Sequence, residues 1–313
     1  MIQDKIRILS DILGGSFRSN DEFLFRCPSC GHHKNKLSVK FSTNVFKCWI
    51  CDYRGKSIRR IVRRFGSRKH LQEWDSLFGG RHDLSEHINF SLFAEKEPEV
   101  KEHVDLPESF KALASKHLSP AARPALGYLK KRGISADDIL RYKIGYACEG
   151  EFAKRIVIPS FDSFGDLNYF IARAYDGNWS RYKNPPVSRD VIFNELTVDW
   201  DSDLVLVEGV FDAINAGNAI PILGSSLRPT SKLFKAIVMN DTPVFMALDN
   251  DAKKKENRII NDLLKYDVEV YKIDTSGYDD VGEMPKEVFE NRKKGAEFVS
   301  ADSYMLYEAI GSI

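Results

Sequence analysis

Three acidic residues in the last third of the chain have the spacing of a metal site. Glu208 ends the apolar run LVLV, and Asp249 and Asp251 follow the later run VFMAL. In an extended chain, residues two apart point to the same face, about 6.5 Å apart at the backbone. Like charges this close repel unless a cation lies between them, and Mg²⁺ prefers a few carboxylates with water and phosphate oxygens. The pattern therefore predicts a site for Mg²⁺ (or Mn²⁺).

The elements around these acids predict a parallel sheet. Apolar runs bounded by polar turns alternate with helical patterns. The expected strands cover residues 203–208, 220–224, 243–248 and 268–273, and the expected helices 210–217, 229–238, 253–265 and 285–293. Because chemistry in such sheets lies at the carboxyl ends of the strands, Glu208, Asp249 and Asp251 should meet at one edge. Asp212 and Asp280 are further candidates there. The alternative is an exposed acidic turn.

Four of the five cysteines form two CxxC pairs, Cys27–Cys30 and Cys48–Cys51, with 17 residues between the pairs. Each pair can form a tight turn that directs two thiolates at one point, and residues 37–47 alternate like a β-hairpin. The pattern predicts a zinc ribbon with one structural Zn²⁺. His32 and His33 remain alternative ligands.

A helix capped by Ser57 is expected to follow this ribbon. Its apolar face would pack on the ribbon, and its other face would carry Arg59, Arg60, Arg63 and Arg64. That face could contact phosphate or simply be solvated.

Basic residues also mark the middle of the chain. Runs at 155–159, 167–174 and 191–195 predict an antiparallel sheet, and the basic residues on or beside it are Arg155, Arg173, Arg181 and Lys183. Each alone is typical of a surface charge. Four of them ahead of an acidic metal site predict a ridge that binds nucleotide or template phosphate.

The length and the charge distribution of the chain limit the classes of protein to which it can belong. The chain has 313 residues and a formal net charge of +1, but residues 1–80 carry 16 Lys/Arg against 7 Asp/Glu, and residues 201–313 carry 13 against 20. A basic first quarter suggests a polyanionic partner. We expect a cytoplasmic protein, since no run has the length of a membrane span and the start lacks a signal-peptide pattern. All seven histidines precede the sheet domain, which favours metal-assisted phosphoryl transfer over histidine chemistry.

In this order of parts the chain resembles DnaG-type DNA primases, and its acidic sheet resembles a Toprim domain. The matching stretches are CPSC and CWIC, YLKKRGISADDILRYKIGYA, RIVIP, VEGVFDA, LGSS, ALDNDA and YDDVGEM. Two features depart from the family. Four cysteines stand where many bacterial primases have a histidine among the ligands, and Gly282 stands where the third acidic motif usually has Asn or Asp. The four cysteines and the short chain resemble compact phage primases of the T-even kind.

The resemblance implies a multidomain chain of α+β and α/β type. Its parts would be a zinc-binding domain (1–70), a linker (71–105), a mixed α+β basic subdomain (106–200), a Rossmann-like parallel Toprim domain (201–284) and a helical tail (285–313). Glu208, Asp249 and Asp251 would hold catalytic Mg²⁺, supported by Asp212 and Asp280. The zinc ribbon would read the template start site.

The implied reaction joins ribonucleoside triphosphates on single-stranded DNA, beside a separate replicative helicase and, for a phage protein, in the host cytoplasm. No membrane partner is expected. Two other functions stay open: a Toprim nuclease or topoisomerase-like enzyme, and a non-catalytic recombination mediator with a zinc site and a Toprim domain.

Overall fold

The computed structural model describes residues 2–19, 22–51, 53–55, 57–78, 103–224, 227–249, 252–266 and 268–299. The chain divides into two compact units, Met1–Glu95 and Lys96–Ile313. Within the described ranges, no helix combines the length and the apolar character needed to cross a membrane.

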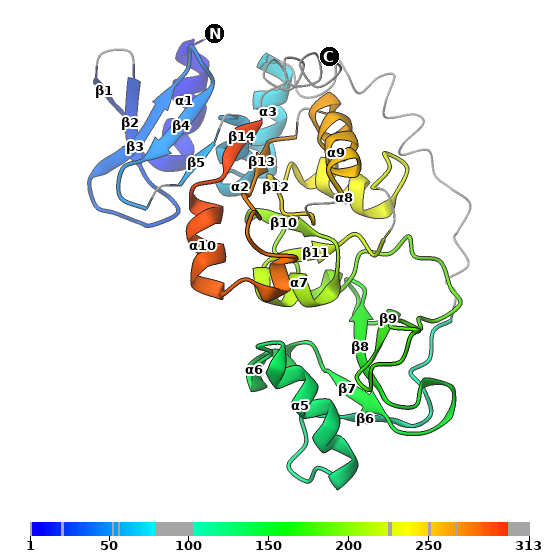
Figure 1. Ribbon diagram of the computed structural model, residues 1–313. Helices are drawn as coiled ribbons and strands as arrows, with labels where there is room; N and C mark the ends of the chain where they lie inside the picture. The colour runs from blue at the N-terminus through cyan, green and yellow to red at the C-terminus, as the bar shows by residue number, and fades with distance from the viewer. Residues whose placement is uncertain are drawn as a thin grey trace, which may run out of the picture. The chain divides into compact units, whose positions relative to one another are not determined.

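The described part of the first unit is a five-stranded sheet with three helices (Figure 1). The strands pair antiparallel in chain order: β1 (Phe17–Ser19), β2 (Glu22–Arg26), β3 (Asn35–Lys40), β4 (Val45–Cys48) and β5 (Arg54–Gly55). The helices are α1 (Ile2–Leu13), α2 (Arg59–Phe65) and α3 (Arg68–Phe78). The predicted hairpin is present as β3 and β4, and its register pairs Leu37 with Cys48. This pairing brings one cysteine of the second CxxC pair into the buried core.

The arginine-rich helix differs from its prediction. Helix α2 begins at Arg59 after Ile58, without a side-chain cap. Arg60 is buried, and the Arg59 guanidinium donates two hydrogen bonds, of 2.7 and 2.8 Å, to the carboxylate of Asp75 in α3. The predicted face of four exposed arginines is therefore wrong. The boundary predicted at residue 70 falls inside α3, whose Trp74 packs in the core of this unit and whose Asp75 supplies the counter-charge.

The second unit begins with a four-stranded antiparallel sheet: β6 (Phe110–Ala112), β7 (Gly145–Ala147), β8 (Arg155–Phe161) and β9 (Leu167–Ala174). Between β6 and β7 lie the 3₁₀ turn η1 (Pro120–Ala122) and the helices α5 (Arg123–Lys131) and α6 (Ala136–Arg141). A further 3₁₀ turn, η2 (Gly150–Phe152), precedes β8. Ser119 caps η1, and Ser135 forms a capping box with Asp138 at the start of α6.

The strand predicted at residues 191–195 is absent. Asn194 adopts a left-handed backbone conformation, with φ of 54°, and begins the 3₁₀ turn η3 (Glu195–Thr197). The run is apolar because Ile192 and Phe193 fill two different cores, one under each sheet of this unit.

A five-stranded sheet follows, in the order β11-β10-β12-β13-β14. Its strands are β10 (Leu204–Val207), β11 (Ala219–Pro221), β12 (Val244–Met246), β13 (Val270–Lys272) and β14 (Glu297–Val299). The first four are parallel, as predicted, and β14 pairs antiparallel with β13. The segment 285–313 is predicted as a helical tail, but its residues 297–299 form the edge strand β14 of this sheet.

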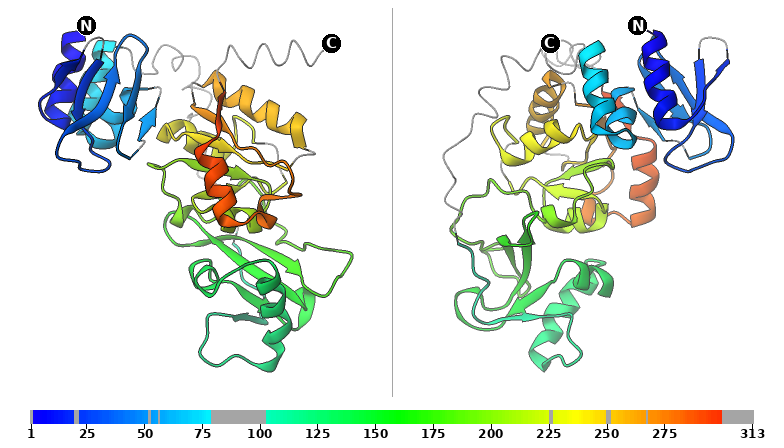
Figure 2. Two further views of the ribbon diagram at one scale, coloured as in Figure 1. Left: turned by 60° about the vertical axis from the view of Figure 1, so that its left-hand side comes forward. Right: turned by 180° about the vertical axis from the view of Figure 1, so that it is seen from behind.

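Helices cover both faces of the parallel sheet (Figures 1 and 2). Helices α7 (Val210–Ala216) and α10 (Lys286–Lys294) pack on one face, and α8 (Lys232–Asn240) and α9 (Lys253–Lys265) on the other. The outer side of α7 also packs against the antiparallel sheet through Val210, Phe211 and Ile214. Helix α7 therefore lies between the two sheets, directly after the strand that ends at the predicted acidic site.

Candidate functional site

The four cysteines of the first unit form one cluster. Their sulfur atoms all lie within 4.8 Å of one another, with 3.7 Å between Cys27 and Cys51 and 3.9 Å between Cys30 and Cys48. A tetrahedral zinc ion about 2.3 Å from each sulfur would keep the sulfurs about 3.8 Å apart. Among the described residues, this is the group with metal-binding geometry. The cluster therefore fits a structural Zn²⁺ closely.

The environment of the cysteines also favours a cation. Burial raises the pKa of the Cys27 thiol to about 12. Cys48 accepts a hydrogen bond from the backbone amide of Ile50 at 3.4 Å, as expected of a sulfur in a metal-binding turn. Four thiolates at this spacing need a positive ion between them. His32 and His33, the alternative ligands, stack on each other with ring centroids 4.5 Å apart.

The acidic edge of the parallel sheet lies where β10 and β12 end. Glu208 directly follows β10, and Asp249 comes three residues after the end of the neighbouring strand β12. No described residue donates a hydrogen bond to the buried Oε1 of Glu208, and Lys255 Nζ lies 3.6 Å from this atom. A buried carboxylate oxygen that accepts no hydrogen bond is a favourable ligand for a cation. Asp251, the third predicted ligand, lies outside the described residues.

Asp212 connects the turns on either side of this edge. Its Oδ2 accepts from the amide of Gly209 at 2.9 Å, and its Oδ1 accepts from the amide of Gly282 at 2.8 Å. Burial, together with the charge of Asp280, raises the pKa of Asp212 to about 6. Its two oxygens hold backbone amides, which makes Asp212 a positioning residue for Glu208 and for the 280–283 turn.

Asp280 caps the 3₁₀ turn η5 (Val281–Glu283) by accepting from the amide of Glu283 at 2.9 Å. A Cβ atom at Gly282 would lie 3.0 Å from Asp212 Oδ1 and 3.2 Å from Asp280 Oδ1. A side chain at 282 would therefore require these two carboxylates to shift by a few tenths of an ångström. Glycine at this position makes no such demand.

The predicted basic ridge is divided between two faces of the antiparallel sheet. Ile156 pairs with Arg173, so Arg155 points to the opposite side. Arg155 is buried, and its guanidinium donates to the carbonyl oxygens of Ser180 at 3.0 Å and Arg181 at 3.4 Å. Lys183 pairs with Glu151 at 2.8 Å. Arg181 is exposed.

Arg173 belongs to a cluster near Asp212 that the sequence prediction missed. Its Nε donates to the hydroxyl of Tyr128 at 3.0 Å, and Arg132 Nε donates to the same hydroxyl at 2.9 Å. The guanidinium of Arg132 lies 4.9 Å from the ring of Phe211 in α7, and its charge lowers the pKa of Asp212 against the larger effect of burial. Tyr128 lies in α5 and Arg132 is the C-cap residue of the same helix, four residues further on, a spacing that could have identified the pair.

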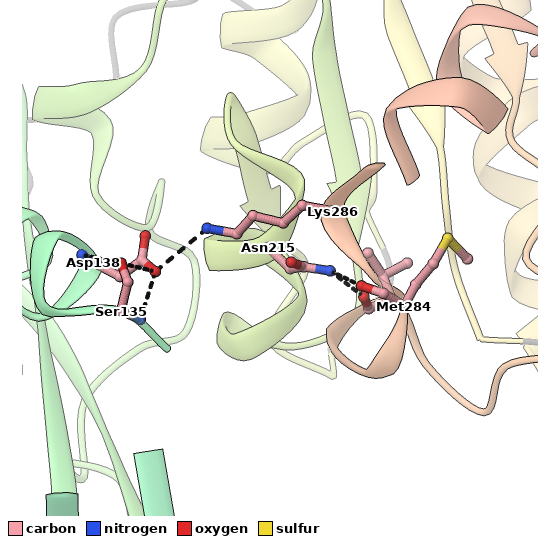
Figure 3. Close-up of polar contacts among 6 residues, drawn as sticks. Ser135, Asp138, Asn215, Met284 and Lys286 are labelled. Atoms are coloured by element: carbon pink, nitrogen blue, oxygen red, sulfur yellow. Dashed lines mark hydrogen bonds and ion pairs between the residues drawn. The ribbon is translucent and has the colours of Figure 1, made fainter. Parts of the chain in front are cut away.

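A cavity of about 530 Å³ lies beside this cluster. Its lining comes from the α5–α6 turn, α7 and the segment from η5 to the start of α10. Figure 3 shows contacts of residues that line it. The Asn215 amide donates to the carbonyls of Val281 and Met284, at 2.7 and 2.6 Å, and Lys286 reaches Asp138 at 3.4 Å.

The chain is similar in sequence to bacterial DNA primases, although no family model matches it. The DNA primase of Mycoplasma genitalium is 23% identical over 296 aligned residues, covering 74% of this chain and 48% of the relative. The DNA primase of Thermotoga maritima is also 23% identical, covering 94% and 58%. The chain thus spans about half the length of the curated relatives it matches.

Solved structures extend the similarity to the fold. The DnaG primase catalytic domain bound to ssDNA is 19% identical, with a TM-score of 0.54 over 62% of this chain and 78% of that chain. The Aquifex aeolicus primase, with its zinc-binding and RNA polymerase domains, has a TM-score of 0.50 at 19% identity over 95% of this chain and 84% of that chain. In sequence and fold, this chain resembles DnaG-type primases. The predicted fold class is confirmed, whereas the likeness to phage primases stays a prediction.

Proposed function

We propose that this chain is a primase that synthesises short RNA primers on single-stranded DNA by metal-assisted nucleotidyl transfer. The observation that carries the proposal is the placement of Glu208 and Asp249 after adjacent parallel strands, with a buried oxygen of Glu208 that accepts no hydrogen bond from a described residue. The primase-like fold of the second unit and the cysteine cluster of the first unit support it.

Each residue of the site would have a distinct role. Glu208, Asp249 and Asp251 would hold Mg²⁺, which would neutralise triphosphate oxygens and make the attacking hydroxyl more acidic. Asp212 would fix the turns that carry Glu208 and Asp280. Arg173, held by Tyr128, would contact phosphate on the side of α7 that faces the antiparallel sheet. Burial gives Arg155 the role of shaping the neighbouring loop.

The first unit would bind the template through the zinc ribbon and choose the start site. The structure that shares the catalytic-domain fold was solved with ssDNA, which supports a single-stranded template as partner. Ribonucleoside triphosphates as substrates, a separate helicase and a cytoplasmic location complete the proposal.

The decisive experiment supplies labelled ribonucleoside triphosphates, Mg²⁺ and single-stranded DNA to the full chain. Short labelled oligonucleotides support the primase. Loss of synthesis is expected in Glu208→Gln and full retention in the matched variant Glu287→Gln, whose carboxylate lies exposed on α10. Zinc content and circular dichroism should stay the same in both, so that misfolding is excluded.

The same assay tests the alternatives. Shortened DNA without labelled oligonucleotides would identify a Toprim nuclease. DNA binding without any synthesis or cleavage, unchanged in Glu208→Gln, would identify a non-catalytic mediator. Primer synthesis that survives Glu208→Gln would reject the assignment of the acidic site.

A further inference from the structure

The loop after β9 presents a tryptophan to solvent. Trp179 is 93% exposed, in the segment between the end of β9 and Tyr182, which bridges back to Arg173. Two side chains order the loop from within. Asp176 Oδ1 accepts from the amide of Asn178 at 3.2 Å, and Asn178 Oδ1 accepts from the amide of Ser180 at 2.9 Å. The indole is therefore exposed on a loop with a defined hydrogen-bonded conformation.

A buried arginine of β8 holds the same loop by hydrogen bonds to its backbone. Arg155 donates to the carbonyl oxygens of Ser180 at 3.0 Å and Arg181 at 3.4 Å, the two residues that follow Trp179. A third contact of 3.5 Å to the carbonyl of Ala172 ties the guanidinium to β9. Burying a charge is costly unless hydrogen bonds satisfy it, so these contacts both stabilise the buried cation and fix the loop. The bracing limits the conformational freedom of Trp179 before any partner binds.

The surroundings of Trp179 indicate the kind of partner. Its chain neighbours are polar: Asp176, Asn178, Ser180 and the exposed Arg181. Aromatic anchors of protein interfaces lie in apolar patches that exclude water. The residues beside this ring in the chain are polar, and Tyr182, an exposed aromatic residue of the same loop, carries the guanidinium of Arg173 4.6 Å from its ring. A nucleic-acid base needs only one ring face, with a cation nearby for the phosphate. A single aromatic ring beside an arginine therefore fits an unpaired base.

We propose that Trp179 stacks on a base of single-stranded DNA, that Arg181 contacts the adjacent phosphate, and that Arg155 positions both. The choice of DNA as the strand rests on the proposed function, whereas the stacking surface rests on the loop itself. The contact is separate from the acidic site, and it requires neither Mg²⁺ nor a ribonucleotide. It would hold the template by stacking, with little dependence on base sequence.

A second exposed aromatic provides the matched control. Phe164 is 85% exposed at the β8–β9 turn. Asp162 and Asp166 flank it, and Asp162 Oδ1 accepts from the amides of Phe164 and Asp166, at 3.0 Å each. Carboxylates repel the phosphate backbone, so the electrostatic potential around this ring is less favourable for binding of single-stranded DNA. The exposed fraction of the aromatic residue is therefore similar in the two turns, and the local charge differs.

The test measures binding of fluorescent oligo(dT) to the full chain by anisotropy, without added divalent metal or ribonucleotide. Trp179→Ala should weaken binding about fivefold or more, the usual effect of removing one stacking ring. Trp179→Phe should restore most of the affinity, and Phe164→Ala should stay within about twofold of wild type. Arg155→Met should also weaken binding, because the loop loses its brace.

Two results would overturn the inference: wild-type affinity in Trp179→Ala, or an equal loss for double-stranded DNA, in which bases are not free to stack. Failure of the inference and failure of the proposed function can be told apart. Primer synthesis that depends on Glu208, with binding indifferent to Trp179, rejects only the stacking surface. Binding that depends on Trp179, in a chain without primer synthesis, supports the stacking surface and rejects only the catalytic proposal.

Discussion

The carboxylate of Asp212 accepts a hydrogen bond from the amide of Gly282, 70 residues further along the chain. The other oxygen of the same carboxylate accepts from Gly209, the residue after Glu208. One buried side chain thus fixes the geometry between the turn at the end of β10 and the turn that contains Asp280. The relative position of the candidate metal-binding acids depends on this side chain, even though both its oxygens are used within the protein.

Replacing Asp212 by asparagine should alter how stability depends on pH. Burial and Asp280 raise the pKa of this carboxyl from 3.8 to about 6 in the folded chain. Well below its ordinary pKa of 3.8 the group is protonated in both folded and unfolded chains. As pH rises through 6, the folded chain bears the cost of the buried charge, and wild type loses up to about 3 kcal/mol of stability from this group. The amide side chain of Asp212→Asn does not titrate, so the variant should lack this loss.

The measurement is urea unfolding of wild type and Asp212→Asn at pH 4 and pH 7 in metal-free buffer. Comparing the two proteins cancels the titration of groups that they share. The variant should also show a constant deficit, since its amide nitrogen cannot accept from a backbone N–H. Parallel pH profiles in the two proteins would contradict the assignment of the raised pKa to Asp212.

Most of the parallel sheet could be predicted from the sequence, because each strand is a short apolar run between turns. The residues of β10 are all buried, as a run of four apolar residues suggests. Strand β14 could not be predicted in this way, since it has three residues, none of them buried, and is defined by pairing with β13. The run at 191–195 misled for the opposite reason: Ile192 and Phe193 are buried in two cores without belonging to a strand.

The site was predictable where it depends on chain order, and less so where it depends on register. The spacing of the four cysteines predicts the cluster that they form in the structure. The order of apolar runs likewise predicts that Glu208 and Asp249 follow neighbouring strands. The faces on which the basic residues lie could be predicted only from the strand register, in which Ile156, and not Arg155, pairs with Arg173. That one-residue difference sends Arg155 to the opposite face, where it is buried. Local composition reports the charge of a segment but not the face on which each side chain lies.

Removing Lys255 should strengthen metal binding at the acidic edge. Its ammonium lies 3.6 Å from Glu208 Oε1, and both side chains are about one-quarter exposed, at 26% and 25%. This cation competes with a metal ion for the carboxylate, and a pair so exposed contributes at most about 1 kcal/mol. Lys255→Met should therefore bind Mn²⁺ roughly two- to fivefold more tightly. The neighbouring Lys254→Met, which removes an exposed charge from the same helix, is the control.

Electron paramagnetic resonance of free Mn²⁺ measures this affinity directly, without relying on activity. Unchanged affinity in Lys255→Met would mean that the lysine does not compete for Glu208. Weaker affinity would mean that the site needs the ammonium for its shape. Either result contradicts the prediction, whereas a similar gain in Lys254→Met would reduce the effect to general electrostatics.

Cys48→Ser should lose the zinc and unfold the first unit. Cys48 is buried in the core of that unit, opposite Leu37, so its loss affects both the metal and the packing. A structural zinc ion contributes on the order of 10 kcal/mol to folding of a small metal-binding domain. Zinc analysis should show about one ion per chain in wild type and in Cys148→Ser, the control, and far less in Cys48→Ser. Full zinc content in Cys48→Ser would remove this residue from the ligand set.

Asp138 should matter for stability more as a helix cap than as the ion-pair partner of Lys286. Its Oδ2 accepts from Ser135 at the start of α6, through the backbone amide at 2.9 Å and the hydroxyl at 2.7 Å. The contact to Lys286 is longer, at 3.4 Å, and the lysine side chain is 55% exposed. Loss of a cap costs about 0.5–2 kcal/mol, whereas an exposed ion pair contributes a few tenths.

Urea unfolding of Asp138→Ala, Asp138→Asn and Lys286→Met separates the two roles. Asp138→Ala should be the least stable, by about 1 kcal/mol, because it loses the capping acceptor. Asp138→Asn keeps an acceptor oxygen and loses the charge, so it should resemble Lys286→Met, within about 0.5 kcal/mol of wild type. A cost for Lys286→Met as large as for Asp138→Ala would show instead that the ion pair between α6 and α10 holds the two sides of the cavity together.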